Sequence, residues 1–469
     1  MADADEAMKL AAWTADAVPA AFVDQASWAE RAAKLPASTA VFAKASGFEG
    51  KAGQLFLTPG PDGALTQVFF GVAPRGGAHS EPFAAGKLAT ALPAGLYRLE
   101  DDIEDAATAA LAFLLSAYSF TRYRASKKER PRLCAPRGVD AARIERLAAG
   151  VAFGRDLINT PANDMGPEAI AQAALGLAAR FGASARAVVG DALLSENFPL
   201  IHAVGRAAAE APRLVEFTHG PADALKVTLV GKGVAYDTGG LDIKPSSAMA
   251  LMKKDMGGAA VALALAQMLL EGGAPLRLRV IVPIVENSVS AASFRTGDVY
   301  PSRKGLSVEV GNTDAEGRLI LADALALASE EQPDLLFDFA TLTGAARVAL
   351  GPDLPPFYTG CDALAEEIAG FARTASDPVW RLPLWEPYDS LLKGKIADIA
   401  NVTSNGFAGS VTAALFLRRF VADPRRWAHF DVYCWNTATK PGRPEGGDIQ
   451  VARLLCDLIE ARARAKAAA

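Results

Sequence analysis

Cysteine is scarce in this sequence, and the few cysteines lack metal-binding or redox spacing. The 469 residues include four, Cys134, Cys361, Cys434 and Cys456, and none of them forms a C-x-x-C motif. This scatter argues against a disulfide framework and is typical of reduced, mostly buried thiols. We therefore expect a cytoplasmic protein.

Long apolar runs and a targeting segment are also lacking. The most apolar stretches, residues 107–117 and 259–270, are shorter than the ~20 residues that a membrane-spanning helix needs. They are typical of buried helices, so we expect no membrane partner. The acidic start, MADADEAMKL, has no basic region followed by an apolar core, and we expect no secretory signal.

An excess of positive charge is absent as well. The formal net charge is -5, whereas a nucleic-acid-binding protein normally shows a basic patch or a strongly basic composition. Basic side chains do gather at residues 122–132, RYRASKKERPR. Such a run is more often a solvated helix end or a linker than a binding site, so we expect no nucleic-acid partner.

What the sequence has in quantity is apolar side chains. They make up 51% of the residues and charged side chains 22%, which is typical of a folded globular protein. A chain of 469 residues exceeds what one hydrophobic core usually serves, so we expect two domains. We place a smaller N-terminal α/β domain at residues 1–135, a connecting helix at 136–160 and a larger C-terminal domain at 161–469.

Short strand-like runs and turns alternate in the N-terminal domain. One run is residues 39–45, and a second is 54–73, where PGPDG is a strong turn signal between two β-rich arms. Apolar residues at helical spacing follow from about 105 to 123. The basic, proline-containing stretch at 124–137 then indicates a boundary.

The C-terminal domain alternates apolar strands with helical patterns. Runs bounded by glycine and separated by helices are typical of an α/β fold in which a mostly parallel or mixed sheet lies between helices. The predicted strands are residues 226–230, 278–285, 306–310, 334–340 and 428–433.

Charged side chains gather beyond two of these strands. GKGVAYDTGGLDIKP follows the strand at 226–230, GNTDAEGRL follows the strand at 306–310, and MKKDMGG enters a helix between them. In open α/β sheets functional sites collect beyond the carboxyl ends of strands, so these loops could face each other. Together they supply four carboxylates and three cations: Asp237, Asp255, Asp314 and Glu316, with Lys232, Lys244 and Arg318.

This charge pattern predicts a metal cluster. Four carboxylates in a small space repel one another and raise their own pKa values unless a multivalent cation neutralises them, and two ions are the simplest solution. An oxygen-rich site with one lysine nitrogen suits Mn2+ or Mg2+ and also admits Zn2+. A lysine ligand must first lose its proton, so metal affinity should fall in acid. None of the four histidines lies in these motifs: His79, His202, His219 and His429.

A pair of metal ions indicates a class of chemistry. Two ions ~3.5–4 Å apart can bridge a water, polarise a carbonyl and anchor a free amine. These are the requirements of amide hydrolysis at a chain terminus. Lys244 would then stabilise the developing oxyanion.

Each motif also has a simpler interpretation. Asp-Thr-Gly-Gly is compatible with a plain turn, Asn-Thr-Asp with an N-cap, and Lys253-Lys254 with a solvated helix face. These interpretations are favoured singly, but a turn needs only one such side chain, whereas seven gather here in three segments. A phosphate-binding loop is excluded, because neither G-x-x-x-x-G-K-[ST] nor G-x-G-x-x-G occurs in GKGVAYDTGG.

The same segments resemble the signature blocks of the leucyl aminopeptidase (cytosol aminopeptidase) family. The matching blocks are VGKGVAYDTGG, LDIKP, MKKDMGGAA and an intact NTDAEGRL. Weaker matches occur at residues 155–167, 340–351 and 397–421, so the resemblance covers the C-terminal two-thirds well and the first third only in pieces.

The resemblance implies a di-metal exopeptidase that removes N-terminal residues from peptides. Asp237 and Glu316 would bridge the two ions, and Asp314 would complete one metal site. Lys232 and Asp255 would complete the other site, where the amino group of the substrate also docks. The family implies Mn2+ or Zn2+, with Mg2+ or Co2+ as alternatives.

The resemblance also implies roles for two cations and an assembly. Lys244 would contact the substrate carbonyl and the gem-diolate. Arg318 would hold a bicarbonate that acts as general base toward the bridging water. The family further implies a homo-hexamer with the N-terminal domain outside and the active sites toward the interior.

Two departures from the family pattern lie in segments that face the substrate. Tyr433 and Cys434 stand where a small Ala-Gly pair is usual, and EGGDIQ, around Gly447 and Asp448, replaces an Ala-Thr-Gly loop. Either Tyr433 reshapes the side-chain pocket, which puts a preference for leucine in doubt, or backbone shifts move it aside into packing. Other predicted pocket positions are apolar or small: Met252, Thr341, Leu342 and Gly344.

A catalytically silent relative, kept as a scaffold or binding protein, is the main alternative. The intact Lys244 and Arg318 argue against it, because a merely structural cluster would not need the catalytic cations.

Overall fold

The computed structural model describes residues 8–74, 81–101, 103–125 and 129–468. The acidic start of the chain, His79 and part of the basic run at 122–132 lie outside the described residues. The chain divides into two compact units, one formed by Met1–Ala152 with Thr437–Glu445, the other by Phe153–Asn436 with Gly446–Ala469. The division falls inside helix α6, Ala141–Asn159.

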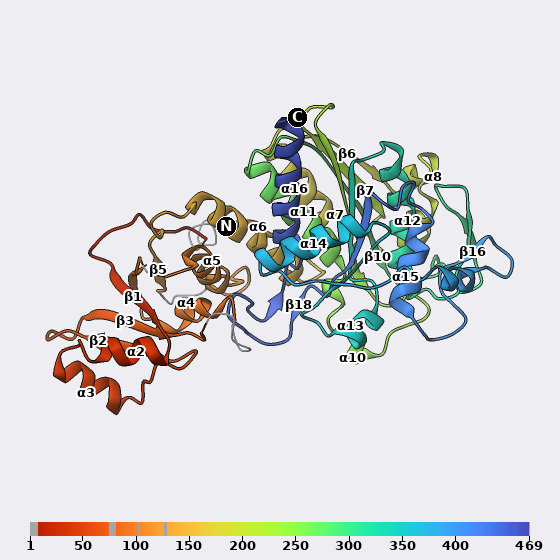
Figure 1. The fold of residues 1–469 in the computed structure, drawn as a ribbon. Coiled ribbons are helices and arrows are strands. Elements are labelled where there is room, and N and C mark those ends of the chain that lie inside the picture. Colours follow the sequence, from red (N-terminus) through yellow and green to blue (C-terminus); the bar gives the residue numbers. More distant parts are fainter. Residues whose placement is uncertain (1–7, 75–80, 102, 126–128, 469) are drawn as a thin grey trace. The chain divides into compact units, whose positions relative to one another are not determined.

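The first unit contains a five-stranded sheet in the order β2-β3-β1-β4-β5 (Figure 1). Strands β2 and β3 form an antiparallel hairpin around PGPDG, which confirms the predicted turn. Strand β5 pairs with β4, so the basic stretch at 124–137 contributes an edge strand to this sheet. The strands are β1 Val18–Val23, β2 Leu55–Pro59, β3 Leu65–Gly71, β4 Gly95–Leu99 and β5 Pro131–Leu133.

One predicted strand of this unit is a helix. Residues 39–45 lie in α3, Ala37–Ala45, which begins after Pro36. The strand prediction was wrong because three alanines favour a helix and the fixed φ of proline suits a helix start. The predicted helix at 105–123 is confirmed as α5, Ala106–Ala117, although it is shorter. Further helices of this unit are α2 Gln25–Ala32 and α4 Leu88–Ala91.

The second unit is built on a nine-stranded mixed sheet in the order β15-β14-β17-β13-β8-β10-β7-β6, with β9 paired to β10. Its centre, β17-β13-β8-β10, is parallel, and β14 and β7 add antiparallel neighbours. The strands are β6 Ser184–Val189, β7 Arg213–His219, β8 Leu225–Gly231, β9 Gly233–Asp237, β10 Leu276–Asn287, β13 Leu335–Ala340, β14 Pro356–Thr359, β15 Trp380–Arg381 and β17 Trp427–Asp431.

Four of the five strands predicted for this unit lie in its main sheet, and the fifth does not. Residues 306–310 contain β12, Ser307–Glu309, which belongs to a separate sheet with β11, Val299–Pro301, and β16, Ile399–Ala400. Only its central residue is buried, whereas β13 is buried along its whole length. The short, half-exposed strand suits a peripheral sheet better than a core that is covered on both faces.

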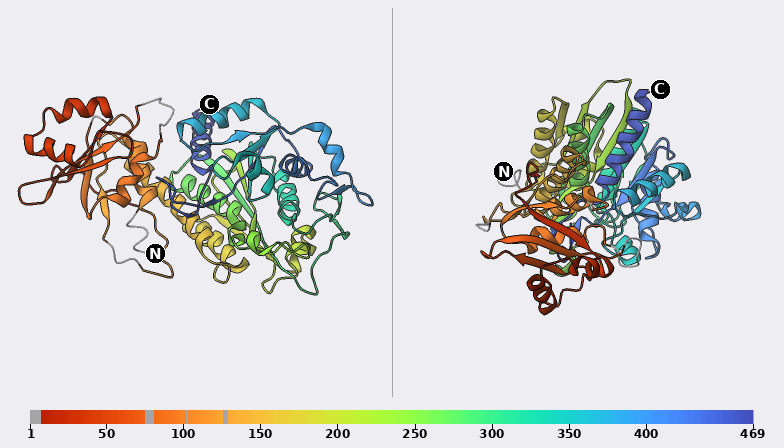
Figure 2. Two further views of the ribbon diagram at one scale, coloured as in Figure 1. Left: turned by 90° about the horizontal axis from the view of Figure 1, so that it is seen from below. Right: turned by 60° about the vertical axis from the view of Figure 1, so that its left-hand side comes forward.

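Helices cover both faces of the main sheet (Figure 2). Helices α7, α11, α14 and α16 are connected by mutual contacts and form one layer. Helices α9, α12 and α15 are connected in the same way and form the second layer. Helix α11 is buried from Gly257 to Leu269, which confirms that the apolar run at 259–270 is an internal helix. The longer helices are α7 Pro167–Arg180, α11 Gly257–Glu271, α12 Glu316–Glu330, α14 Asp362–Thr374, α15 Gly409–Arg418 and α16 Ala452–Ala468.

Short helices complete the second unit. They are α8 Ala192–Ser195, α9 Pro199–Gly205, α10 Ser246–Met249, η2 Met252–Met256, α13 Gly344–Leu350 and η3 Glu386–Leu392. In the described part of the chain, no helix is long and apolar enough to cross a membrane.

Candidate metal centre

The carboxyl ends of the central strands place the backbone of the site. Lys232 follows β8, and its amide donates to the carbonyl of Phe339 in β13 at 3.0 Å. The carbonyl of Lys232 accepts from the amide of Ala259 in α11 at 2.8 Å. Gly258 makes this close approach possible, because a Cβ there would collide with the carbonyl oxygen of Phe339. The predicted glycine-rich helix entry therefore anchors the start of α11 to the sheet.

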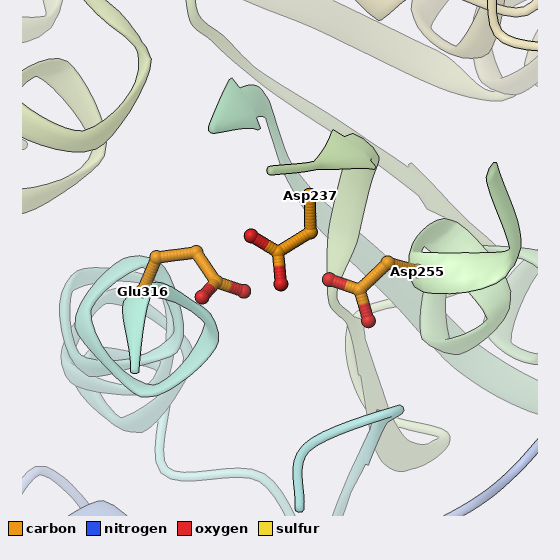
Figure 3. A group of neighbouring side chains, drawn as sticks. All are labelled: Asp237, Asp255 and Glu316. Carbon is orange, nitrogen blue, oxygen red and sulfur yellow. The ribbon is translucent and has the colours of Figure 1, made fainter. Parts of the chain in front are cut away.

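Three carboxylates from separate elements meet at this edge (Figure 3). Asp237 ends β9, Asp255 lies in η2 and Glu316 begins α12. Their ligand oxygens lie within 4.8 Å of one another, and each residue is at most 3% exposed. The structure thus brings together the carboxylates of three of the five predicted metal ligands. These residues lie up to 79 positions apart in the sequence.

Two lysines supply the counter-charge. Lys232 Nζ lies 2.7 Å from Asp255 Oδ2 and 2.9 Å from Glu316 Oε1. Lys244 Nζ lies 2.9 Å from Asp237 Oδ2 and also forms an ion pair with Asp314, which brings the fourth predicted carboxylate to the cluster. Four carboxylates therefore face two ammonium groups, which leaves an excess of negative charge.

The pKa shifts follow from this balance. Burial opposes the charge of Lys232, but Asp255, Glu316 and Asp237 together raise its pKa above the usual value. Burial likewise opposes the charge of Lys244, and Asp237 and Asp314 raise the pKa of its ammonium group. Burial and neighbouring carboxylates raise the pKa of Asp255 to about 7, and burial with Asp237 raises that of Asp314 to about 7. The cluster therefore binds protons tightly until another cation replaces them.

Several oxygens of the cluster have no partner but an ammonium group. Among the described residues, buried Asp255 Oδ2, Asp314 Oδ1 and Glu316 Oε1 face only a lysine Nζ. Buried polar atoms are normally satisfied, and carboxylate oxygens are the ligands that hard divalent cations prefer. The donor set and its unsatisfied oxygens fit a pair of divalent ions.

Neighbouring polar groups orient the carboxylates. Asn287 Nδ2 donates to Asp237 Oδ1 at 2.8 Å, and the Gly239 amide donates to the same oxygen at 2.9 Å. Thr341 Oγ1 donates to Asp255 Oδ1 at 2.6 Å. Each bond holds one carboxylate oxygen and leaves the other directed at a lysine. Asn287 was not predicted as a site residue, although its place just beyond the predicted strand 278–285 was an available signal.

Asn401 is a second residue that the sequence analysis missed. Its Oδ1 accepts from the Gly311 amide at 2.7 Å, and its Nδ2 donates to the Asn312 carbonyl at 2.8 Å. Its own carbonyl accepts from Arg318 Nη1 at 2.6 Å. Asn401 is fully buried, so it holds the Asn-Thr-Asp loop and the guanidinium in one arrangement.

Arg318 keeps donor capacity for an anion. Its Nε is buried and has no hydrogen-bond partner among the described residues, and burial lowers the pKa of the guanidinium to about 10. An unpaired buried donor of this kind fits a small oxyanion such as bicarbonate.

Tyr433 packs between two cations. Its ring centroid lies 4.7 Å from Lys254 Nζ and 5.5 Å from Arg347 Cζ, and its amide donates to Gln450 Oε1 at 2.9 Å. The following Cys434 is buried with a φ of 58°, which turns the backbone sharply after Tyr433. Burial lowers the pKa of Lys254 to about 8.

The other predicted pocket residues lie on the same segments. Met252 and Lys254 share η2, Thr341 follows β13, and Gly344 begins α13 and is exposed. The Leu342 amide donates to Asp431 Oδ1 at 3.1 Å. Their roles toward a substrate stay predictions.

The EGGDIQ loop is held by buried polar contacts. Asp448 forms an ion pair with Arg155 at 3.1 Å, and the Gly447 amide donates to Asn159 Oδ1 at 2.8 Å. Gln450 connects the loop to Tyr433 through the bond described above. The two departures from the family pattern are therefore in direct contact.

Comparison with known proteins shows which family the chain resembles. The model of the cytosol aminopeptidase family catalytic domain matches residues 152–456, and an aminopeptidase N-terminal domain model matches 18–136. A protein of Chlamydia abortus described as "Probable cytosol aminopeptidase" is 44% identical over 293 residues, which span 61% of this chain and 58% of that protein. The match therefore covers less than two thirds of that relative.

Solved structures match over nearly the whole chain. The cytosol aminopeptidase of Coxiella burnetii is 42% identical with a TM-score of 0.93, covering 97% of this chain and 100% of that one. The bottromycin maturation enzyme BotP in complex with Mn is 32% identical with a TM-score of 0.86, covering 96% and 100%. Sequence, fold and matched domains agree, and the chain belongs to the cytosol aminopeptidase family.

Proposed function

We propose that this chain is a di-metal aminopeptidase that hydrolyses N-terminal residues from peptides. The observation that carries the proposal is the cluster of Asp237, Asp255 and Glu316, whose ligand oxygens lie within 4.8 Å of one another. Two lysines complete the cluster, and Arg318 lies on the same helix as Glu316. Membership of the cytosol aminopeptidase family supports the same activity.

The metal ions would be held by five side chains. Asp237 and Glu316 would serve both sites, Asp314 one of them, and Lys232 with Asp255 the other. Mn2+ or Zn2+ fits this oxygen-rich set, with Mg2+ or Co2+ as alternatives, and the similar BotP is described in complex with Mn. When bound, such ions supply a nucleophile at neutral pH and a Lewis acid for the scissile carbonyl.

The cations of the chain would act on the substrate itself. The raised pKa of Lys244 keeps it protonated at neutral pH, so it can donate a hydrogen bond to the oxygen on which charge develops. The buried Nε of Arg318 would orient a bicarbonate as general base. Lys232 and Asp255 would position the free amino group, which restricts cleavage to the chain terminus.

The direct test combines metal content with hydrolysis of a panel of aminoacyl amides, with and without chelator. We expect two ions per chain and a loss of activity on their removal. Asp255→Ala and Glu316→Ala should abolish both. Lys244→Met should keep the metals and lower kcat about 10²- to 10³-fold, as loss of an oxyanion donor does elsewhere. Activity that survives complete metal removal would refute the proposal.

We also propose that the enzyme is a cytoplasmic homo-hexamer. Large apolar side chains are exposed on the second unit, and several lie close in sequence: Trp380 is 58% exposed, Trp385 54% and Ile396 75%. Exposed apolar groups that form a contiguous patch mark association surfaces, and the number of six subunits comes from the family resemblance. Analytical ultracentrifugation should give six times the chain mass, and a monomer at micromolar concentration would contradict this.

A further inference from the structure

Lys254 is a buried lysine beside the metal centre that lacks a carboxylate partner. The residue is 6% exposed, yet among the described residues no ion pair or side-chain hydrogen bond involves its ammonium group. Within the described part of the chain, its ammonium group lies over the ring of Tyr433, 4.7 Å from the ring centroid. Burying a charge without a counter-ion is costly, so the position of this ammonium group indicates that an anion binds beside it.

The nearby carboxylates are already engaged. Asp255, next in the chain, faces Lys232 and accepts from Thr341. Asp431 forms an ion pair with Arg347 at 2.5 Å and accepts from Thr343 Oγ1 at 2.6 Å. Arg347, the other cation on the Tyr433 ring, thus has a carboxylate of its own. Asp255, the carboxylate whose charge acts on Lys254, is instead paired with Lys232.

The location of Lys254 points to the side chain of the substrate. It immediately precedes Asp255, which is proposed to help hold the ion at the substrate's amino group. It shares η2 with Met252, and its ammonium group contacts Tyr433, two residues that the family resemblance assigns to the side-chain pocket. A side chain on the first residue of a peptide would therefore project toward this ammonium group.

We propose that Lys254 is a specificity-determining residue that binds the carboxylate of an acidic N-terminal side chain, with the ring of Tyr433 holding the ammonium group in place. The preferred substrates are then peptides that begin with aspartate or glutamate. This inference rests on the proposed aminopeptidase function. It gives Tyr433 a role in the pocket in place of the small residue usual in the family.

The neighbouring Lys253 provides a matched control. Its Nζ donates to the Asn159 carbonyl at 2.7 Å and lies 5.5 Å from the ring centroid of Trp435. The two successive lysines thus have different partners, and only Lys254 contacts Tyr433. A Lys→Met change at either position removes the same charge and keeps a similar length.

The experiment compares kcat/KM of the metal-loaded enzyme for Glu-Ala against Gln-Ala and for Asp-Ala against Asn-Ala, with Ala-Ala as reference. We expect at least one acid-to-amide ratio of about tenfold or more, as for a charged hydrogen bond in a buried site. Lys254→Met should bring that ratio to about one. Lys254→Arg should retain most of it, and Lys253→Met should leave it unchanged.

A second measurement does not depend on turnover. Free glutamate and glutamine, as product analogues, are titrated against the metal-loaded protein by competition with a bound inhibitor, and glutamate should bind about tenfold more tightly unless Lys254 is replaced. Equal acid and amide ratios in the wild type would overturn the inference while leaving the aminopeptidase intact. Absence of hydrolysis of every peptide would instead overturn the proposed function, and the binding comparison would then decide the role of Lys254.

Discussion

In the candidate metal centre, protonated lysines lie between the carboxylates and balance part of their charge. Lys232 lies between Asp255 and Glu316, and Lys244 between Asp237 and Asp314. The carboxylates hold these ammonium groups by charge, which is why the lysine pKa values rise despite burial. A metal ion must compete with protons on both types of group, so metal binding and proton release are coupled.

We predict that metal affinity falls steeply as the pH decreases through 7. The pKa of Asp255 and of Asp314 is raised to about 7, so below this value both carboxyl groups hold protons that a metal must displace. Above it they are ionised, and Lys232 alone must still lose a proton. Calorimetric titration with Mn2+ should show about tenfold weaker binding per pH unit for each proton displaced. A constant affinity between pH 6 and 8 would contradict this coupling.

At the residue scale the sequence predicted the charged groups but not the polar groups that orient them. Asp237 and Glu316 each lie in a short motif that is rich in charged residues, so each can be recognised from its own stretch of sequence. Asn287 and Asn401 act across 50 and 89 residues, on Asp237 and on the Asn312 carbonyl, so neither lies in the motif that it orients. Only the fold brings such partners together.

Asn401 acts at the level of an element, because it fixes the loop that connects β12 to α12. Its side chain satisfies Gly311 and Asn312, and its main-chain carbonyl accepts from Arg318. We predict that Asn401→Ala weakens Mn2+ binding about 10- to 100-fold, as removal of groups that orient metal ligands does elsewhere. Equilibrium dialysis measures this. Asn405→Ala, in the exposed part of the following loop, should bind Mn2+ like the wild type.

Helix α11 approaches the sheet so closely that its second residue must be glycine. A Cβ on Gly258 would collide with the Phe339 carbonyl and lie 2.9 Å from the Lys232 amide nitrogen. We predict that Gly258→Ala lowers the free energy of unfolding by about 3 kcal/mol, at the upper end for overpacking. Urea unfolding followed by circular dichroism measures the loss.

Gly370→Ala in α14 is the matched control for this substitution. An added Cβ there meets nothing within 4 Å, so alanine should stabilise the helix by about 0.5–1 kcal/mol. Similar effects of the two substitutions would show that the close approach at Gly258 is not needed.

Element predictions succeeded where burial on both faces dictates the pattern. The strands predicted at 226–230, 278–285 and 334–340 became β8, β10 and β13 in the parallel centre of the sheet. The prediction of a strand at 39–45 failed because its alanines favour a helix, and α3 leaves Val41 and Phe42 exposed. The strand at 306–310 was found but assigned to the wrong sheet, because local pattern carries no information on partners.

At the scale of the whole molecule, every candidate ligand lies in the second unit, although the segments that carry them are separated along the chain. Metal binding would therefore join β9, η2 and α12, and none of the candidate ligands lies in the N-terminal sheet. A ligand that binds only the folded state stabilises it, by about 2.7 kcal/mol per site at a concentration of 100 Kd.

We predict that Mn2+ protects amides of the second unit from hydrogen exchange and leaves β1 to β5 unchanged. Protection should be largest in peptides that contain Asp237, Asp255 and Glu316, because the metal opposes the local opening of the segments that hold it. Glu316→Ala should remove the effect while the N-terminal sheet exchanges as before. Equal protection of both units would contradict this prediction, because it would mean that metal binding also stabilises the N-terminal unit, which holds no candidate ligand.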